Sequence, residues 1–348
     1  MTVTLADVAA HAGVSPATVS RVLNGNYPVA EATRERVLQA VDELDYVLNG
    51  PASSLAAATS DLVGILVNDI ADPFFGIIAG AAQNAIGACA SGRAGGEKLA
   101  VVCNTGGSPE RELMYLTLLQ RQRAAAVVLT GGSYDDPEHL AATATKLARL
   151  SEAGTRVVLC GRPPVPGDAT ATTLAFDNRG GARKLTEHLL SLGHRRIALI
   201  MGPERYTTTR HRLDGHRAAL AAAGLGDVPT VHGLYDRASG YEATRELLRR
   251  APDLTAIVAA SDTVALGACA ALRDLGLSIP GDVSVTGFDD LPFAIDASPA
   301  LTTVRLPLQD AGRRAGLLAM GTGDVPAGGL TTVEAELVVR ESTAPPRA

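Results

Sequence analysis

From Leu62 onward, short runs rich in β-branched residues alternate with longer segments rich in alanine and leucine. This alternation is typical of parallel β-sheets whose two faces are covered by helices. A single sheet built from so many strands would exceed one hydrophobic core, so the pattern predicts two α/β lobes. The expected strands are 62–67, 99–103, 126–130, 156–160, 172–176, 197–201, 256–259, 283–286 and 303–305.

The chain before this region has apolar residues at helical spacing and predicts an all-α unit. Thr4 and Asp7 are spaced as in a capping box, and Gly13 can end the short helix that they begin. Ser15 followed by Pro16 can begin a second helix, and a third apolar stripe follows the next loop. Helix, short glycine turn, helix and a third helix are the shape of a helix-turn-helix module.

The residue string from Thr4 to Asn24 is more specific than this helical pattern. It closely resembles the head of the lactose-repressor (LacI/GalR) family of bacterial transcription regulators, in which the second helix enters the major groove. The resemblance assigns base reading to Pro16, Ala17 and Arg21. It assigns contacts with DNA phosphates to Thr4, Ser15, Thr18, Ser20 and Asn24.

The chemistry of these side chains agrees with the roles that the resemblance implies. Arg21 can offer two parallel donors to guanine O6 and N7, which is worth about 1–3 kcal/mol of discrimination between bases. Pro16 and Ala17 can offer only apolar contacts, for example with a thymine methyl group. Short hydroxyl side chains at a helix start suit phosphate oxygens, although Ser15 and Thr18 could also serve only as caps.

Residues 49–60 resemble the hinge of the same family, where a leucine from each subunit wedges into the minor groove. Leu55 matches that leucine, and an apolar wedge can kink a duplex. Gly50 and Pro51 depart from the family, because this stretch commonly carries arginine and because both residues lower helix propensity.

The charge of the first sixty residues is unusual for a DNA-binding unit. They hold three arginines against six acidic residues, a net charge of −3. DNA readers normally present a basic surface. We therefore expect weak non-specific binding with a shallow salt dependence, and reduced or lost DNA binding is the alternative.

The resemblance continues through the α/β region to about Arg340. It implies a type I periplasmic-binding-protein-like fold, with two doubly wound lobes and a small effector in the cleft. This agrees with the rule that open α/β sheets bind ligands beyond the carboxyl ends of their strands. The segments that carry the similarity are 72–75, 192–197, 261–267, 285–290 and 299–304.

Effector contacts are also carried over from the family, one position at a time. The implied residues are Phe74, Phe75, Arg212, Tyr235, Asp289, Ser261 and Arg210. Aromatic faces that pack on C–H groups, with Arg and Asp facing hydroxyls, suit a sugar. A larger number of arginines would favour a phosphorylated metabolite.

Several of these positions have a second interpretation. Phe75 could belong to the core, and Arg212 and Asp289 could pair with each other or cap helices. Ser261 stands where several family members have a ligand-facing Asn, and Asp262 is expected to cap the following helix.

Motifs of other function classes are missing from the sequence. It has no phosphate-binding glycine loop, nucleophile elbow or zinc-protease motif. The four cysteines are scattered without zinc-ligand spacing. We therefore expect no catalysis, no cofactor and no metal. No apolar run could cross a membrane and the start lacks a secretion signal, so the expected location is the cytoplasm.

Together these features predict a helix-turn-helix head (1–48), a hinge (49–60) and a two-lobed effector-binding and dimerisation domain (61–348). The expected function is a repressor of carbohydrate-use genes that a small effector modulates. Its expected partners are a near-palindromic double-stranded DNA operator and a second copy of the chain. A solute receptor without DNA function and an enzyme acting on a small polar substrate are the alternatives. The glycine-rich loop 91–96 has no assigned role.

Overall fold

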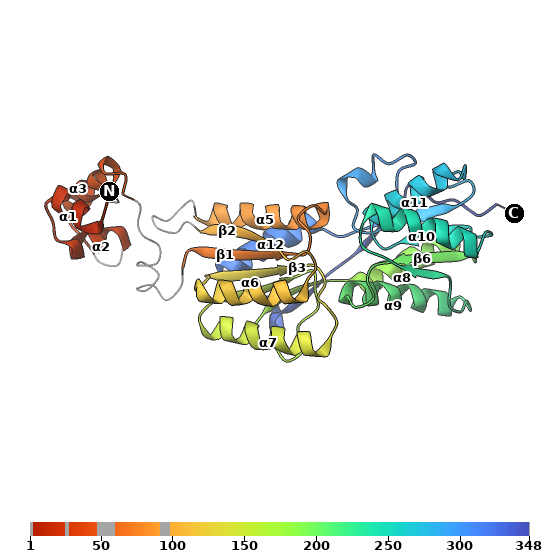
Figure 1. Ribbon diagram of the computed structural model, residues 1–348, viewed down its shortest axis with the longest axis horizontal. Helices are drawn as coiled ribbons and strands as arrows, with labels where there is room; N and C mark the ends of the chain where they lie inside the picture. Colours follow the sequence, from red (N-terminus) through yellow and green to blue (C-terminus); the bar gives the residue numbers. More distant parts are fainter. Residues whose placement is uncertain (1–2, 25–27, 47–59, 91–97, 348) are drawn as a thin grey trace.

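A computed structural model describes residues 3–24, 28–46, 60–90 and 98–347 of the chain (Figure 1). Leu55 and the loop 91–96 lie outside the described residues, as does the side chain of Asn24. The described residues form a helical unit at the N-terminal side and two α/β lobes.

The helical unit contains α1 (Leu5–Ala12), α2 (Pro16–Asn24) and α3 (Glu31–Glu43), as the sequence predicts. The capping box at its start is formed, because the Thr4 amide donates to Asp7 Oδ2 (2.8 Å) and the Asp7 amide donates to Thr4 Oγ1 (3.4 Å). The three helices bury Val8, Val19 and Val37 completely, which gives the unit its own small core.

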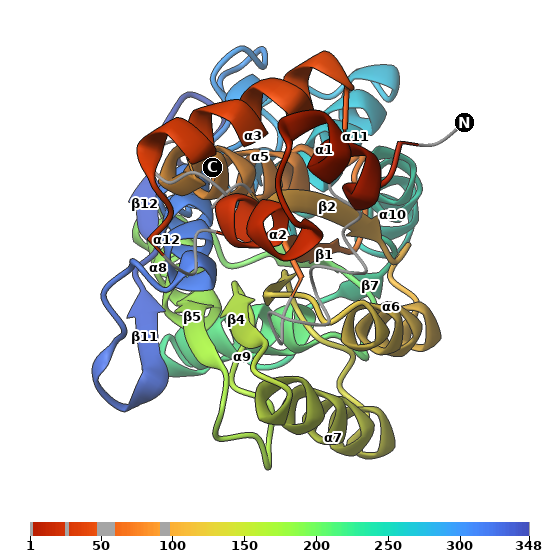
Figure 2. The same ribbon diagram turned by 90° about the vertical axis from the view of Figure 1, so that its left-hand side faces the viewer.

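The first lobe is a parallel six-stranded sheet in the order β11-β5-β4-β3-β1-β2. Helices α5 and α12 cover one face of this sheet, and α6 and α7 cover the other (Figure 2). The strands are β1 (Leu62–Val67), β2 (Leu99–Asn104), β3 (Ala126–Thr130), β4 (Arg156–Cys160), β5 (Thr172–Phe176) and β11 (Leu330–Val333). The helices are α5 (Pro73–Ala90), α6 (Pro109–Arg121), α7 (Pro137–Glu152) and α12 (Leu308–Met320).

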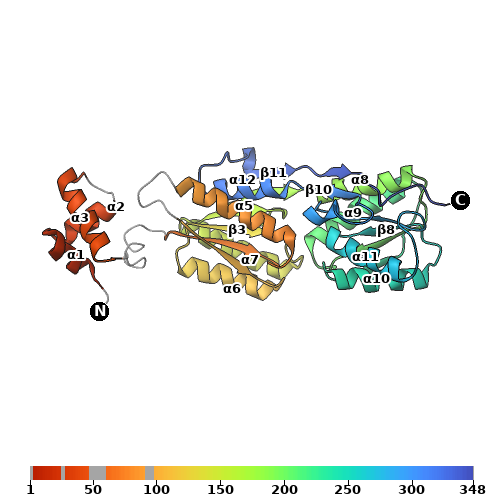
Figure 3. The same cartoon turned by 90° about the horizontal axis from the view of Figure 1, so that it is seen from above.

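The second lobe is a parallel four-stranded sheet in the order β7-β6-β8-β9, with α8 and α9 on one face and α10 and α11 on the other (Figure 3). The strands are β6 (Ile197–Met201), β7 (Thr230–His232), β8 (Ala256–Ala259) and β9 (Ser284–Thr286). The helices are α8 (Asn178–Ser191), α9 (Thr207–Ala222), α10 (Arg237–Arg250) and α11 (Asp262–Asp274). The remaining elements are the antiparallel pair β10 (Thr303–Arg305) and β12 (Glu336–Val338) and the 3₁₀ turns Pro292–Ala294 and Ala327–Gly329.

The chain passes between the lobes after β5, before α12 and after β11, so each lobe contains segments that are far apart in the sequence. Helix α12 returns to the first lobe and lies along α5 (Figure 3). Glycine permits this close packing, since a Cβ atom on Gly312 would lie 2.4 Å from the Ile78 carbonyl oxygen and one on Gly316 would lie 2.5 Å from that of Ala82.

The predicted architecture of two α/β lobes is confirmed, with every expected strand present. The short strands β7, β11 and β12 were not expected. Each has only three or four residues, most of which are not buried, so no apolar run marks it.

Candidate functional site: a cavity between the lobes

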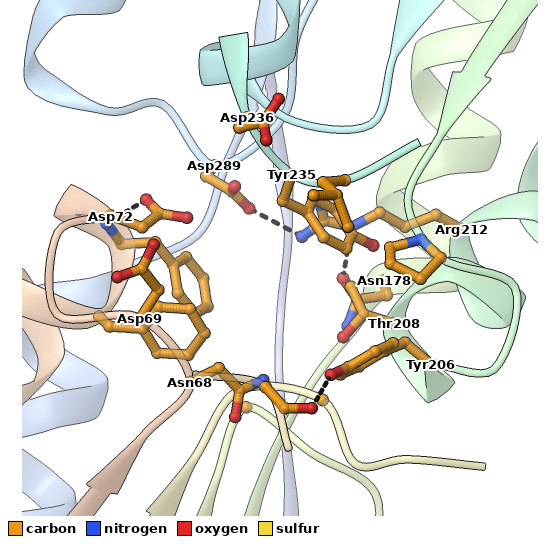
Figure 4. A pocket seen from close by; sticks show the side chains of 18 of the residues that line it. Asn68, Asp69, Asp72, Asn178, Tyr206, Thr208, Arg212, Tyr235, Asp236 and Asp289 are labelled. Atoms are coloured by element: carbon orange, nitrogen blue, oxygen red, sulfur yellow. Dashed lines mark hydrogen bonds and ion pairs between the residues drawn. The ribbon is translucent and has the colours of Figure 1, made fainter. Parts of the chain in front are cut away.

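A cavity of about 250 Å³ lies between the two lobes, beyond the carboxyl ends of their strands (Figure 4). Residues of the first lobe that line it are Asn68, Asp69, Asp72, Phe74, Phe75, Phe176 and the glycines 106, 107, 131, 132 and 161. Residues of the second lobe that line it are Asn178, Pro203, Tyr206, Thr208, Arg212, Leu234, Tyr235, Asp236 and Asp289.

The first lobe contributes an aromatic wall to the cavity. The ring of Phe74 lies edge-on to Phe75 (4.9 Å between centroids) and to Phe176 (6.2 Å). Glycines at the strand ends make room for these rings, because a Cβ atom on Gly131 would lie 2.5 Å from Phe75 and one on Gly161 would lie 2.8 Å from Phe176. Phe74 is almost buried and Phe75 is half-buried, so Phe75 belongs to the cavity wall while it also packs against the core.

The second lobe contributes a buried polar group centred on Arg212. Its Nε donates to Asn178 Oδ1 (2.8 Å), its Nη2 to Asp289 Oδ1 (2.7 Å) and its Nη1 to the carbonyl oxygen of Ala260. The guanidinium also stacks over the ring of Phe288, 3.7 Å from its centroid. Arg212 and Asp289 therefore do pair with each other, and the pair lies within the second lobe.

Asp262 fixes the loop that carries Asp289 through two hydrogen bonds. Its two carboxylate oxygens accept from the Leu291 amide (2.7 Å) and the Thr303 hydroxyl (2.6 Å), and burial raises the pKa of Asp262 to about 8. Asp289 itself has φ of 102°, a strained conformation of the kind that is often found at functional sites. Asp262 does not cap α11.

Ser261 takes that capping position, contrary to its expected place in the effector site. Its hydroxyl accepts from the Val264 amide (3.3 Å), it is buried, and it is not among the residues that line the cavity. The short serine side chain caps its own helix and therefore does not extend into the cavity, whereas a longer Asn side chain could.

Tyr235 lies over Gly202, where a Cβ atom would come within 2.2 Å of the ring. Its hydroxyl hydrogen-bonds with the Thr209 hydroxyl (2.9 Å), and burial raises the pKa of Tyr235. The ring thus presents an edge to the cavity in a fixed position (Figure 4).

Asp72 faces the cavity from the first lobe, opposite Asp289 (Figure 4). Its Oδ1 accepts from the Phe74 amide (3.0 Å) at the start of α5. Burial, with a smaller contribution from Asp289 and Asp69, raises the pKa of Asp72 to about 6. This carboxyl group therefore changes charge just below neutral pH.

The two lobes touch directly at one end of the cavity. The Tyr206 hydroxyl donates to the Gly107 carbonyl oxygen (2.6 Å), and the Asp135 amide donates to the Arg205 carbonyl oxygen (2.6 Å). Arg210, expected in the effector site, instead forms an exposed ion pair with Asp135 across this contact and is not among the cavity residues. Two residues within one turn of α9 thus have different roles, because positions 210 and 212 face different sides of the helix.

The structure therefore brings together Phe74, Phe75, Arg212, Tyr235 and Asp289 around one cavity. Polar residues that the sequence interpretation did not select also line it, and they are Asn68, Asp69, Asp72, Tyr206, Thr208 and Asp236. Asn178 lines it too, and its place after a strand allowed it either to reach the cleft or to cap the next helix. A positional signal was available for most of them, since they directly follow a strand or begin a helix on the side where a doubly wound sheet binds ligands.

In the helical unit, Pro16, Ala17 and Arg21 are exposed on one side of α2, opposite buried Val19. The hydroxyl of Ser15 accepts from the amide of Thr18 (3.2 Å), which is the capping interaction.

Thr4 is exposed, but its hydroxyl donates to Asp7 Oδ2 (2.7 Å), so a phosphate would have to share or replace that bond. Ser20 is partly buried on α2.

The described ranges contain neither a metal-ligand cluster nor a helix suited to span a membrane. No group of three or more His, Cys, Asp or Glu side chains there is arranged to hold a metal ion. Among the helices of those ranges, none is both long and apolar enough to cross a membrane.

Comparison with known proteins matches both parts of the chain to family models. Residues 4–49 match the model of bacterial regulatory proteins of the lacI family, and residues 186–343 match a periplasmic binding protein-like domain. Among curated relatives, the HTH-type transcriptional regulator CelR of Thermobifida fusca is 38% identical over 97% of this chain and 98% of its own length. MalR of Streptomyces coelicolor is 37% identical over 99% of this chain and 97% of its own length.

Solved structures agree with this assignment. The lac repressor dimer bound to operator and the anti-inducer ONPF has a TM-score of 0.81 at 28% identity, covering 99% of this chain and all of that one. A complex of the transcriptional regulator CelR with cellobiose has a TM-score of 0.66 at 36% identity, covering 98% of this chain and 99% of that one. With a helix-turn-helix unit followed by two lobes around a cavity that has an aromatic wall and a buried polar group, this chain belongs to the lacI family of bacterial regulatory proteins.

Proposed function

We propose that this protein is a cytoplasmic, non-enzymatic repressor of carbohydrate-use genes whose operator binding is modulated by a sugar. The observation that carries the proposal is the cavity, where an aromatic wall faces a fixed Arg212–Asp289–Asn178 group. Aromatic faces pack on the C–H groups of a sugar, and the polar group offers donors and acceptors to its hydroxyls. The solved complex of the relative CelR contains cellobiose, which supports a carbohydrate ligand.

The proposed effector contacts are Phe74, Phe75, Arg212, Tyr235 and Asp289, with Asn178 and Asp72 added from the cavity. Ligand binding at a site built from both lobes favours the arrangement that closes it, because each lobe supplies part of the contact. A change in lobe arrangement then acts on the DNA-binding unit through the segment 49–60, the proposed hinge. A 100-fold change in DNA affinity requires about 2.7 kcal/mol of coupling.

The proposed DNA-binding surface is the exposed side of α2. Pro16, Ala17 and Arg21 occupy it, with Ser15 and Thr18 near its start. Arg21 is proposed to read a guanine, and Leu55 is proposed to enter the minor groove at the operator centre. The domain limits proposed for this arrangement are 1–48, 49–60 and 61–348.

A near-palindromic operator calls for a two-fold dimer. The lac repressor structure that this chain resembles is a dimer on its operator. In the first lobe, the edge strand β2 exposes Leu99 (66%) and Val101 (39%), which are apolar side chains suited to a subunit contact. Sedimentation of the chain should therefore give the mass of a dimer, and Leu99→Glu should shift it toward the monomer.

The test of the proposed function is fluorescence anisotropy with DNA from upstream of the chain's own gene and its neighbours. Selective binding at low salt, released or strengthened by one member of a sugar panel, is the expected result. Arg21→Ala should weaken binding to the operator and relax base preference at one position in each half-site, by about 1–3 kcal/mol. A control, Arg183→Ala, changes an exposed arginine of α8 and should leave DNA binding unchanged. Absence of selective DNA binding under every condition would contradict the proposal.

A further inference from the structure

The charges of the cavity lining are strongly unequal. Four carboxylates line it, from Asp69, Asp72, Asp236 and Asp289, and Arg212 is the one cationic side chain among the described lining residues. In Figure 4, Asp69, Asp72, Asp236 and Asp289 lie toward one end of the cavity, and they come from both lobes. A ligand at that end therefore meets negatively charged hydrogen-bond acceptors from both lobes.

Arg212 does not offset this charge for a ligand. Each of its guanidinium nitrogens already donates to a protein acceptor, on Asn178, Ala260 or Asp289. The ion pair with Asp289 (2.7 Å) neutralises the guanidinium charge, and this leaves Asp69, Asp72 and Asp236 to supply the net negative charge of the lining. Three of its five N–H donors are thus engaged, and a phosphate at the remaining two would approach a guanidinium whose charge is already neutralised and would meet the Asp289 carboxylate beside it.

Two of the helix starts at the cavity are also occupied by carboxylates, whereas the start of α9 at Tyr206 has no side-chain cap. The amino ends of α5 and α10 would ordinarily attract an anion. Asp72 accepts from the Phe74 amide at the start of α5 (3.0 Å), and Asp236 accepts from the Ser239 amide at the start of α10 (2.7 Å). At the starts of α5 and α10, the chain's own carboxylates thus fill the place that a phosphate or a sugar acid would take.

These carboxylates keep capacity for a ligand. Within the described residues, Asp69, Asp72 and Asp236 each use one oxygen to accept from a nearby backbone amide, at 2.7–3.0 Å. Their second oxygens remain able to accept from a hydroxyl or an ammonium group. Neutral sugars carry hydroxyl donors. Amino sugars also carry an ammonium group, whose positive charge is attracted to carboxylates.

We infer that the cavity selects carbohydrates without negative charge, either neutral or amino-substituted, and rejects phosphorylated and acidic sugars. The inference rests on the proposed sugar-binding function and deepens it by specifying the charge of the effector. Asp69 from the first lobe and Asp236 from the second lobe are the residues to which it assigns the discrimination.

The experiment is isothermal titration calorimetry of the full chain with matched sets of sugars. One set is glucose, glucosamine, glucose 6-phosphate and glucuronate. A second set is galactose with the same three substitutions, and a third is cellobiose with its diamino analogue and its 6′-phosphate. In any set with a binding member, the anionic forms should bind at least about tenfold more weakly than the neutral form at low salt. The amino form should bind at least as tightly, and added salt should narrow these differences.

The double variant Asp69→Asn/Asp236→Asn tests the assignment. Asparagine can still accept the backbone hydrogen bonds of Ala71 and Ser239, so the local turns are retained. The ratio of neutral to anionic affinity should fall at least threefold in this variant. The matched control Asp227→Asn removes one exposed carboxylate outside the cavity lining and should leave the ratio unchanged.

Two results would overturn the inference in distinguishable ways. Equal or tighter binding of a phosphorylated or acidic sugar would refute the charge selection while the sugar-binding function stands. Binding of none of the neutral, amino or anionic sugars would refute the sugar site itself, and the inference would fall with it.

Discussion

The two lobes contribute to the cavity in different ways. The second lobe presents Arg212, Asn178 and Asp289, which are all buried and joined by hydrogen bonds of 2.7–2.8 Å. The first lobe presents the half-buried ring of Phe75 and the carboxyl group of Asp72, whose cavity-facing atoms are less constrained. A buried polar network orients a ligand, whereas an apolar wall mainly adds contact area. We therefore expect the second lobe to orient the ligand and the first lobe to add contact area with it when the lobes close.

The largest expected effect breaks the network of the second lobe. Arg212→Met leaves Asp289 and Asn178 buried without their partner, and this should lower the free energy of unfolding by about 3–5 kcal/mol. Urea denaturation measures the loss. Adding Asp289→Asn to this variant should recover much of the stability, because the unpaired charge is then gone. A loss below about 1 kcal/mol in the single variant would show that the network is not a stabilising unit.

The next effect concerns pH and compares a carboxyl group from each lobe. The folded pKa of Asp262, about 8, exceeds its ordinary value of 3.8. Its contribution to stability is therefore complete below about pH 4 and is lost as the pH rises through 8, with a slope of at most about 1.4 kcal/mol per pH unit. Asp262→Asn should remove this slope from urea denaturation curves measured between pH 4 and 8.

Asp72→Asn is the comparison from the first lobe. The pKa of Asp72 is raised only to about 6, so the corresponding loss of stability occurs between about pH 4 and 6 and is smaller. Identical pH profiles for the two variants would contradict the difference between the lobes.

A smaller effect is expected from the apolar wall. Phe75→Ala should weaken binding of the effector sugar about tenfold, which corresponds to about 1.4 kcal/mol, because the ring then no longer covers one face of the ligand. Calorimetric titration measures the affinity. Unchanged affinity would assign Phe75 to the core alone, the alternative that its packing against the core leaves available.

The smallest effect is expected at Arg210, where the sequence interpretation and the structure disagree. Its side chain is 51% exposed and pairs with Asp135 outside the cavity lining. Exposed ion pairs contribute about 0–1 kcal/mol, so Arg210→Gln should change sugar affinity less than about threefold. Asp135→Asn should reproduce the same small change. A loss of sugar affinity in Arg210→Gln as large as the tenfold loss expected for Phe75→Ala would return Arg210 to the effector site.

Local sequence was enough for much of this molecule. Thr4 with Asp7, Gly13 and Ser15 mark helix ends through contacts within a few residues, and those caps are formed where the spacing predicts them. The long buried strands were equally visible, because a run such as 197–201 is apolar throughout and buried throughout. The short strands β7, β11 and β12, which are mostly not buried, carry no such run and were missed, whereas the equally short β9 and β10 were predicted.

The contacts of the cavity required the tertiary structure. Asp289 and Arg212 are 77 positions apart, and no local pattern states that one neutralises the other. Arg210 and Asp135 are likewise 75 positions apart. Their ion pair places Arg210, a predicted effector residue, at a contact between the lobes. Ser261 is an exception, because it caps its own helix through the amide of Val264, three residues further along the chain.

Sequence by itself thus determined the order of the elements, the two-lobed class and the family, because propensity, capping and burial pattern act over short distances along the chain. Only the folded structure decided which charges meet. Whether a side chain is paired, buried or open to a ligand depends on segments that the chain crossings bring together from distant parts of the sequence.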